Sequence, residues 1–344
     1  DLYEQYADYK DWFDIAGKLS GRIRHASIHA GGVGIVDTKI TDYMGMKLGS
    51  KGEHVIQVDK KKIEEIGIIK FDILGVATLK VIQEVIQDTG LDLWDIDINN
   101  PKFEYDKNAY KLLQEARSNG VFQVESQGMK DLLLRLHPEN LEDLSAVLAL
   151  YRPDSMSMLE DYIHYKHNPT EIKYWHEDLK PILEKTYGSI IYQEQVMDIV
   201  RVFGDRTYGG ADKFRKGIGR KDKELVQQEA HKLYQEIIDN DYKEPLAKQI
   251  SDYLALMGGY SFNKSHSALY AVLCLQTAYL KAHYPAYFFK ALFNLNKNDY
   301  GALNKYIIDA KEHGVEILSP HINKSQKDFV VMDGKILFGL EAIK

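Results

Sequence analysis

The chain has 344 residues, of which 44% are hydrophobic, 28% charged and 11% aromatic, and its formal net charge is −7. This composition is typical of a folded domain, and with one cysteine, Cys274, it excludes disordered, collagenous and disulfide-stabilised classes. No apolar run approaches the roughly 18 residues that cross a bilayer, so we expect a cytoplasmic protein without a membrane partner.

The first 76 residues show a mixture of helix and strand patterns. An amphipathic helix is expected over residues 3–19. Three segments with strand-like spacing follow, at 28–36, 54–59 and 66–74. We expect these three segments to form one small mixed sheet.

From Ala77 onward, apolar residues recur mostly with helical spacing, beginning with the stripe that runs from Leu79 to Ile86. Cys274 lies in one of these apolar stripes and is expected to be a small core residue. Further helices are predicted over 106–117, 141–150, 190–203, 222–240, 244–257 and 264–283.

Three short strand-like segments lie near the end of the sequence, at 315–318, 329–332 and 335–338. The last two are separated by Asp333-Gly334, a dipeptide typical of tight hairpins. The predicted fold class is therefore α+β, with a small mixed sheet followed by a large, mostly helical region that ends in a small hairpin.

Lys70 and Asp72 stand two residues apart in the otherwise apolar segment 68–74. Because side chains alternate along a strand, both charged groups fall on one face. An ion pair on an exposed sheet surface explains them most simply, since burying either charge alone is costly. A strand-borne carboxylate beside a lysine also suits metal-dependent phosphoryl transfer, in which the carboxylate holds Mg²⁺ and the lysine neutralises phosphate charge.

The segment 206–223 concentrates positive charge in an acidic chain, with seven Lys or Arg against two Asp. Its pattern predicts a helical turn that starts at two glycines, followed by a loop. Arg215 and Lys216 are adjacent there, a combination suited to a triphosphate or a nucleic-acid backbone. A solvated charged face is the alternative interpretation.

Four polar side chains stand at the start of the predicted helix 264–283: Asn263, Lys264, Ser265 and His266. Asn or Ser would cap the helix, and free N–H groups at a helix start attract an anion. Capping explains one of the four residues, so both interpretations stay open.

Eight motifs in collinear order resemble the alpha subunit of bacterial DNA polymerase III, a C-family replicative polymerase. They are His29-Ala-Gly-Gly-Val, Lys70-Phe-Asp-Ile-Leu-Gly75, Gly120-Val-Phe-Gln-Val-Glu-Ser126, Ala149-Leu-Tyr-Arg-Pro153, Tyr187-Gly188 with Tyr192-Gln-Glu-Gln-Val-Met197, Gly210-Ala-Asp212 with Arg215-Lys216, Phe262-Asn-Lys-Ser-His-Ser267 and Gln276-Thr-Ala-Tyr-Leu-Lys-Ala-His-Tyr-Pro285.

The resemblance implies a palm like that of polymerase beta, a nucleotidyltransferase in which three aspartates bind two Mg²⁺ ions. Asp72 matches the third aspartate and is the implied catalytic and metal-binding residue. The implied nucleotide-binding residues are Lys70, Arg215, Lys216, Asn263, Lys264, Ser265 and His266. The implied contacts to DNA or phosphate are His29, Arg152, Arg220 and Lys221.

The resemblance also implies a domain order. Residues 1–27 would be the end of the thumb, 28–76 the C-terminal part of the palm, and 77–344 the fingers. The family's first two aspartates lie in an Asp-x-Asp motif upstream of the third, and nothing before Asp72 matches it. Asp95-Ile96-Asp97 has the spacing but follows Asp72, so we reject it.

Two motifs depart from the family's pattern. Asp154-Ser155 stands where the family usually has Gly-Pro, and Lys216 stands where it usually has a second Arg. These changes indicate a divergent member of the family and leave the details of nucleotide contact open.

The function implied by the resemblance is a DNA-directed DNA polymerase that adds deoxynucleotides to a primer by two-metal phosphoryl transfer. We expect this chain to be a fragment of it that is inactive alone. Its expected partners are primer-template DNA, deoxynucleoside triphosphates, the upstream palm with its Asp-x-Asp motif, and replisome subunits such as the sliding clamp through regions absent here. This implied role leads us to expect that the protein associates with the nucleoid during replication. The alternatives are a non-catalytic DNA- or nucleotide-binding module, or one half of a split polymerase.

Overall fold

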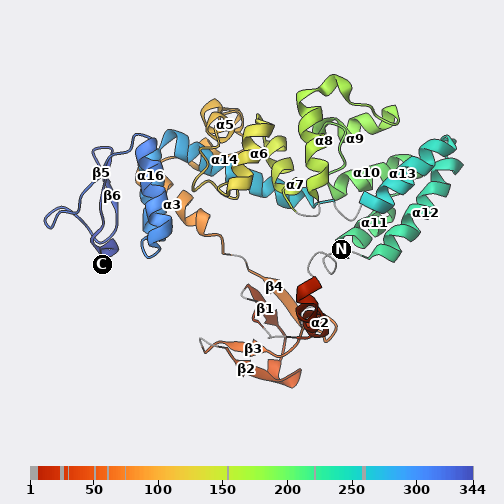
Figure 1. The fold of residues 1–344 in the computed structure, drawn as a ribbon, viewed down its shortest axis with the longest axis horizontal. Coiled ribbons are helices and arrows are strands. Elements are labelled where there is room, and N and C mark those ends of the chain that lie inside the picture. Colours follow the sequence, from red (N-terminus) through yellow and green to blue (C-terminus); the bar gives the residue numbers. More distant parts are fainter. Residues whose placement is uncertain are drawn as a thin grey trace. The chain divides into compact units, whose positions relative to one another are not determined.

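The computed structural model describes residues 7–23, 27–29, 31–49, 52–59, 62–73, 75–152, 155–220, 222–257 and 261–343, without the side chains of Ser157, Arg220 and Met257. Internal contacts divide the chain into two compact units, Asp1–Val76 and Ala77–Lys344. Figure 1 shows the helices and strands of both.

Unit 1 contains one α-helix and four short strands among its described residues. They are the 3₁₀ helix η1 (Ala7–Tyr9), α2 (Lys10–Leu19), β1 (Gly32–Ile35), η2 (Ile40–Asp42), β2 (Met46–Leu48), β3 (His54–Ile56) and β4 (Ile69–Asp72).

The expectation of one small mixed sheet in unit 1 was wrong for the described strands. Strand β1 pairs antiparallel with β4, and β2 pairs antiparallel with β3, which gives two separate two-stranded sheets. The predicted helix was too long at its start within the described residues, where α2 begins at Lys10. Strand β2 was not predicted, because three residues are too few to show an alternating pattern.

Unit 2 is mostly helical. Its helices are α3 (Ala77–Thr89), η3 (Leu93–Ile96), α4 (Pro101–Glu104), α5 (Lys107–Gln114), α6 (Gln127–Leu136), α7 (Leu141–Leu150), α8 (Met156–His167), η5 (Pro169–Glu171), η6 (Glu177–Leu179), α9 (Lys180–Leu183), η7 (Glu184–Thr186), α10 (Gln193–Gly204), α11 (Tyr208–Arg220), α12 (Lys223–Asp239), α13 (Glu244–Met257), α14 (Lys264–His283), α15 (Pro285–Asn296) and α16 (Tyr300–Glu312).

A small three-stranded sheet follows the helices of unit 2. It contains β5 (Ile317–Leu318), β6 (Val330–Met332) and β7 (Lys335–Leu337) in the order β5-β7-β6, and η9 (Leu340–Ala342) comes after it. Strand β6 pairs antiparallel with β7, and the predicted hairpin is confirmed. Asp333 and Gly334 both have positive φ angles, 49° and 74°, as a tight primed turn requires.

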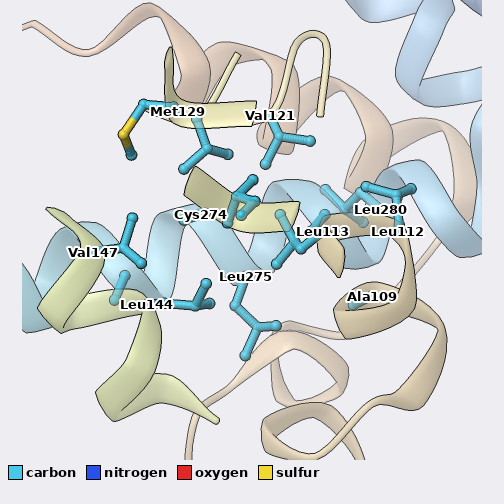
Figure 2. Close-up of a cluster of buried hydrophobic side chains, with 14 of the residues drawn as sticks. Ala109, Leu112, Leu113, Val121, Met129, Leu144, Val147, Cys274, Leu275 and Leu280 are labelled. Carbon is cyan, nitrogen blue, oxygen red and sulfur yellow. The ribbon is translucent and has the colours of Figure 1, made fainter. Parts of the chain in front are cut away.

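Two hydrophobic cores stabilise unit 2. The larger core surrounds α14, which packs against α7, α5, α3 and α15. Figure 2 shows Cys274 and Leu275 of α14 between Leu144 of α7 and Leu113 of α5. Cys274 is fully buried, which confirms the expected core role, and burial raises the pKa of its thiol to about 12. The smaller core lies among α9 to α13.

The predicted α+β class is confirmed by these elements. None of the described helices is both long enough and apolar enough to cross a membrane.

Lys281 of α14 carries a fully buried ammonium group. It donates hydrogen bonds to the carbonyl oxygens of Arg117 and Asn119, at 2.7 and 2.9 Å, and to Asp309 Oδ2 of α16 at 2.7 Å. Burial lowers the pKa of Lys281 to about 8, although Asp309 acts in the opposite direction. One buried group therefore ties the loop after α5 to both α14 and α16.

Replacing Lys281 with Met should lower the free energy of unfolding by about 3–5 kcal/mol, because it leaves the Asp309 carboxylate buried without its cation. Urea denaturation measures the change. The exposed Lys311→Met variant is the matched control and should change stability by at most about 0.5 kcal/mol. An unchanged urea midpoint for Lys281→Met would contradict this account of the loop.

Candidate functional site

Strand β4 carries the first group of predicted site residues. Lys70 Nζ lies 3.2 Å from Asp72 Oδ2, so the two side chains share a face as the strand periodicity predicted. His29 Nδ1 lies 3.3 Å from Asp72 Oδ1. The side chain of Asp72 is 53% exposed. The structure thus brings His29, Lys70 and Asp72 together around one accessible carboxylate.

Two glycines at the start of β1 make room for this group. Gly32 faces Asp72 in the β1–β4 pairing, and a Cβ at Gly32 would lie 2.3 Å from His29 Nδ1. A Cβ at Gly31 would lie 2.6 Å from the carbonyl oxygen of Ile73. Any side chain at these two positions would displace His29 or the end of β4.

Helix α11 carries the second group. The prediction of a helical turn followed by a loop was wrong, because α11 is a continuous helix of 13 residues. Its glycines weaken a helix. However, Ala211, Phe214 and Ile218 are buried on one face, and their packing against the smaller core outweighs that cost.

Asp212 holds both predicted cations of α11. Its carboxylate accepts from Arg215 Nε at 2.7 Å and pairs with Lys216 Nζ at 2.9 Å. Hydrogen bonds from Lys216 and Arg215 lower the pKa of Asp212. Arg215 makes this bond through its Nε, and its two terminal nitrogens have no partner among the described residues, so their edge is open to a second anion in bidentate geometry.

Arg206 belongs to the same basic segment, but its side chain stabilises the fold through ion pairs. Its side chain is 9% exposed and lies 2.6 Å from Glu229 Oε2 and 2.6 Å from Glu236 Oε2, both on α12. The local excess of positive charge is therefore partly neutralised by buried ion pairs.

The start of α14 carries the third group. Asn263 caps the helix by accepting from the backbone N–H of His266 at 2.9 Å, so the capping interpretation holds for that residue. Ser265 and His266 are exposed.

Lys264 is held by two glutamates from other helices. Its Nζ lies 3.0 Å from Glu142 Oε1 of α7, and its backbone N–H donates to Glu194 Oε2 of α10 at 2.9 Å. The second oxygen of Glu142 is buried without a hydrogen-bond partner among the described residues. The sequence did not reveal this pairing, because Lys264 and Glu142 are 122 residues apart.

A row of side chains with ring contacts begins beside this group. The guanidinium of Arg152 lies 4.5 Å from the centroid of the Phe262 ring. Phe262 contacts His266 at 5.5 Å between centroids, and His266 contacts Tyr270 at 4.3 Å. Tyr270 in turn contacts Phe122 at 5.0 Å. The structure thus brings Arg152 next to the predicted nucleotide-binding segment.

Helix α11 packs against α10, whose first turn holds Lys264 through Glu194. The second and third groups are therefore on connected helices of unit 2. Arg220 ends α11, but its side chain and the whole of Lys221 lie outside the described residues.

Replacing Glu229 with Gln should destabilise the chain at neutral pH by about 2 kcal/mol, since it weakens a charge-assisted bond to Arg206. Burial raises the pKa of Glu229, but hydrogen bonds from Lys232 and Arg206 outweigh this and lower it below its ordinary value of 4.5. The stabilisation is therefore present above about pH 4.5 and is lost as the pH falls through the folded-state pKa.

Urea denaturation of both proteins between pH 3 and 7 checks this pH dependence. The exposed Glu224→Gln variant of the same helix is the control, with a change of at most about 1 kcal/mol. A gap between wild type and Glu229→Gln that stays constant down to pH 3 would contradict the assignment.

Known proteins similar to this chain are polymerase subunits. DNA polymerase III subunit alpha of Aquifex aeolicus (strain VF5) is 40% identical over the whole chain, and that of Escherichia coli (strain K12) is 39% identical. The subunit of Buchnera aphidicola is 42% identical. The chain spans 30 to 31% of the length of these relatives.

Three family models match successive parts of the chain. Residues 1–75 match the bacterial DNA polymerase III alpha NTPase domain, and residues 77–241 match the bacterial DNA polymerase III alpha subunit finger domain. Residues 314–344 match a helix-hairpin-helix motif; the described part of that stretch contains β5, β6, β7 and η9. The chain belongs to the bacterial DNA polymerase III alpha subunit family.

Proposed function

We propose that this chain supplies part of the active site of a DNA-directed DNA polymerase that adds deoxynucleotides to a primer. Asp72 is its catalytic carboxylate, and the cations of unit 2 bind the triphosphate of the incoming nucleotide. The observation that carries the proposal is the accessible Asp72 carboxylate with Lys70 Nζ at 3.2 Å, in a chain of this family.

The donor set at Asp72 fits a share in a magnesium site. Mg²⁺ prefers oxygen ligands and is commonly held by one or two protein carboxylates together with water and substrate phosphates. No group of three metal-binding side chains occurs among the described residues, so Asp72 would be one ligand of a site completed by upstream aspartates. Bound there, two Mg²⁺ ions would neutralise the charge that develops on the transferring phosphate.

The protein's own cations have a separate role in this proposal. Arg215 offers its two terminal nitrogens, and Lys216 and Lys264 offer ammonium groups that are now paired with carboxylates. A triphosphate carries several negative charges and can replace those carboxylates as the partner of each cation. Lys70, His266 and Ser265 are further proposed contacts, whereas His29 and Arg152 are proposed contacts to DNA or phosphate.

The 344-residue chain alone should show no primer extension with Mg²⁺ and all four deoxynucleotides, because a single catalytic aspartate cannot hold two metal ions in reactive geometry. Primer extension by rigorously purified chain tests this expectation. Template-dependent synthesis would show that the site is complete without upstream aspartates.

Replacing Asp72 with Asn in a complete polymerase should reduce the rate of synthesis by at least about a thousandfold, the scale seen when a central electrostatic group is lost. The melting temperature should change little, because ion pairs of exposed carboxylates contribute about 0–1 kcal/mol. Single-turnover extension measures the rate, and the exposed Asp37→Asn is the control. Near-normal extension by Asp72→Asn would move the catalytic role elsewhere.

Replacing Arg215 with Ala in the complete polymerase should strongly weaken nucleotide use, while DNA affinity and its salt dependence barely change. If Arg215 instead contacts the DNA backbone, the salt slope should fall by about one and nucleotide dependence should survive. Lys213→Ala removes an exposed charge from the same helix and is the control.

A further inference from the structure

The loop between α5 and α6 has a strained backbone that is held in place at many points. Ala116 and Gln123 adopt left-handed conformations, with φ angles of 52° and 64°. Such angles are unfavourable for residues other than glycine, and they persist where the surrounding structure enforces them. The loop therefore keeps one defined conformation, although the backbone angles of these two residues cost free energy.

Hydrogen bonds from several elements fix the shape of this loop. Ser118 Oγ donates to the carbonyl of Val124 at 2.6 Å inside the core. The N–H of Phe122 donates to Thr277 Oγ1 of α14 at 3.1 Å, and Lys281 binds two further carbonyls. Nothing in this network involves the Gln123 side chain, which is exposed and makes no hydrogen bond with another described residue.

Gln123 lies at a pocket of about 450 Å³ in unit 2, within the range that accommodates small ligands. The walls combine apolar side chains, such as Val81 of α3, Met129 of α6 and Leu292 of α15, with a similar share of polar groups. Gly120 is needed at its edge, since its φ is 72° and a Cβ there would lie 2.4 Å from Leu292 Cδ1.

The pocket contains one carboxylate, Glu125. It accepts from the N–H of Gly120 at 2.9 Å, Tyr306 OH at 3.1 Å and Lys305 Nζ at 3.2 Å. Burial raises its pKa, but these donors outweigh burial and lower it. Glu125 is already paired with Lys305, and none of the described residues that line the pocket is a cation, so the pocket suits a neutral ring better than a phosphate group.

The row of contacting rings links this pocket to Lys264 and the other polar residues at the start of α14. Phe122 lines the pocket and contacts the ring of Tyr270, which contacts the ring of His266, two residues from Lys264. One end of the row is therefore suited to an anion and the other to a neutral ring. A nucleotide has this same division between its phosphates and its base.

We propose that the pocket formed by residues 120–126 and α15 binds a nucleobase, with the Gln123 amide hydrogen-bonded to the edge of the base. The amide offers both donors and an acceptor, so it can bond to any of the four bases. This inference rests on the proposed function, since it assumes that the residues at the start of α14, Lys264 to His266, bind the phosphates. The base could belong to the incoming nucleotide or to a DNA strand.

Dissociation constants of the complete polymerase for each deoxynucleoside triphosphate, for inorganic tripolyphosphate and for primer-template DNA test the proposal. Gln123→Ala should weaken nucleotide binding about three- to tenfold, the effect of one lost hydrogen bond, and leave tripolyphosphate binding unchanged. If the base belongs to DNA, Gln123→Ala should instead raise the dissociation constant for primer-template DNA. An abasic template should abolish this difference between the variant and the wild type. Unchanged nucleotide and DNA constants would overturn the proposal.

Two controls keep the outcome interpretable. Gln127→Ala removes an exposed amide that bonds Asp131 and does not line the pocket, so it should leave all three constants unchanged. Gln123→Ala should keep the wild-type melting temperature, because the Gln123 side chain is exposed. Failure of wild-type polymerase to bind tripolyphosphate would refute the phosphate site separately, whatever Gln123→Ala does.

Discussion

The buried ammonium group of Lys281 is the interaction on which the arrangement of unit 2 depends. It joins the loop after α5 to α14 and α16 through three hydrogen bonds of 2.7 to 2.9 Å. Helix α14 also carries Lys264 and His266 at its other end. One rigid helix therefore connects the loop after α5 to these two candidate site residues. In the proposed function, charged groups must be in position before the substrate arrives, and burial of this kind provides the rigidity.

Each group of candidate site residues pairs its cations with nearby carboxylates. Asp72 pairs with Lys70, Asp212 with Arg215 and Lys216, and Glu142 with Lys264. These pairs orient long side chains that would otherwise lose conformational entropy on binding. In the proposed function, the triphosphate replaces the carboxylates as the partner of the cations, and metal ions replace Lys70 as the partner of Asp72. The carboxylates therefore orient the cations and also compete with the substrate for them.

The sequence predicted the fold class and the shared face of Lys70 and Asp72, since periodicity determines both. The sequence did not predict α11 as a continuous helix. The glycines of α11 are typical of loops, and they make the apolar residues that stabilise the helix hard to recognise in the sequence. The sequence also missed Glu142 as the partner of Lys264 and the contact between the rings of Tyr270 and Phe122. Such contacts depend on packing between distant segments, which local patterns do not encode.

The most direct test of the central claim is the position of the metal in the active complex. A crystal of the complete polymerase with primer-template DNA, nucleotide and Mn²⁺ in place of Mg²⁺ would show the metal by its anomalous scattering. The account predicts an anomalous peak about 2 Å from a carboxylate oxygen of Asp72. Metal peaks bound only by other carboxylates, with Asp72 still paired to Lys70 and His29, would contradict it.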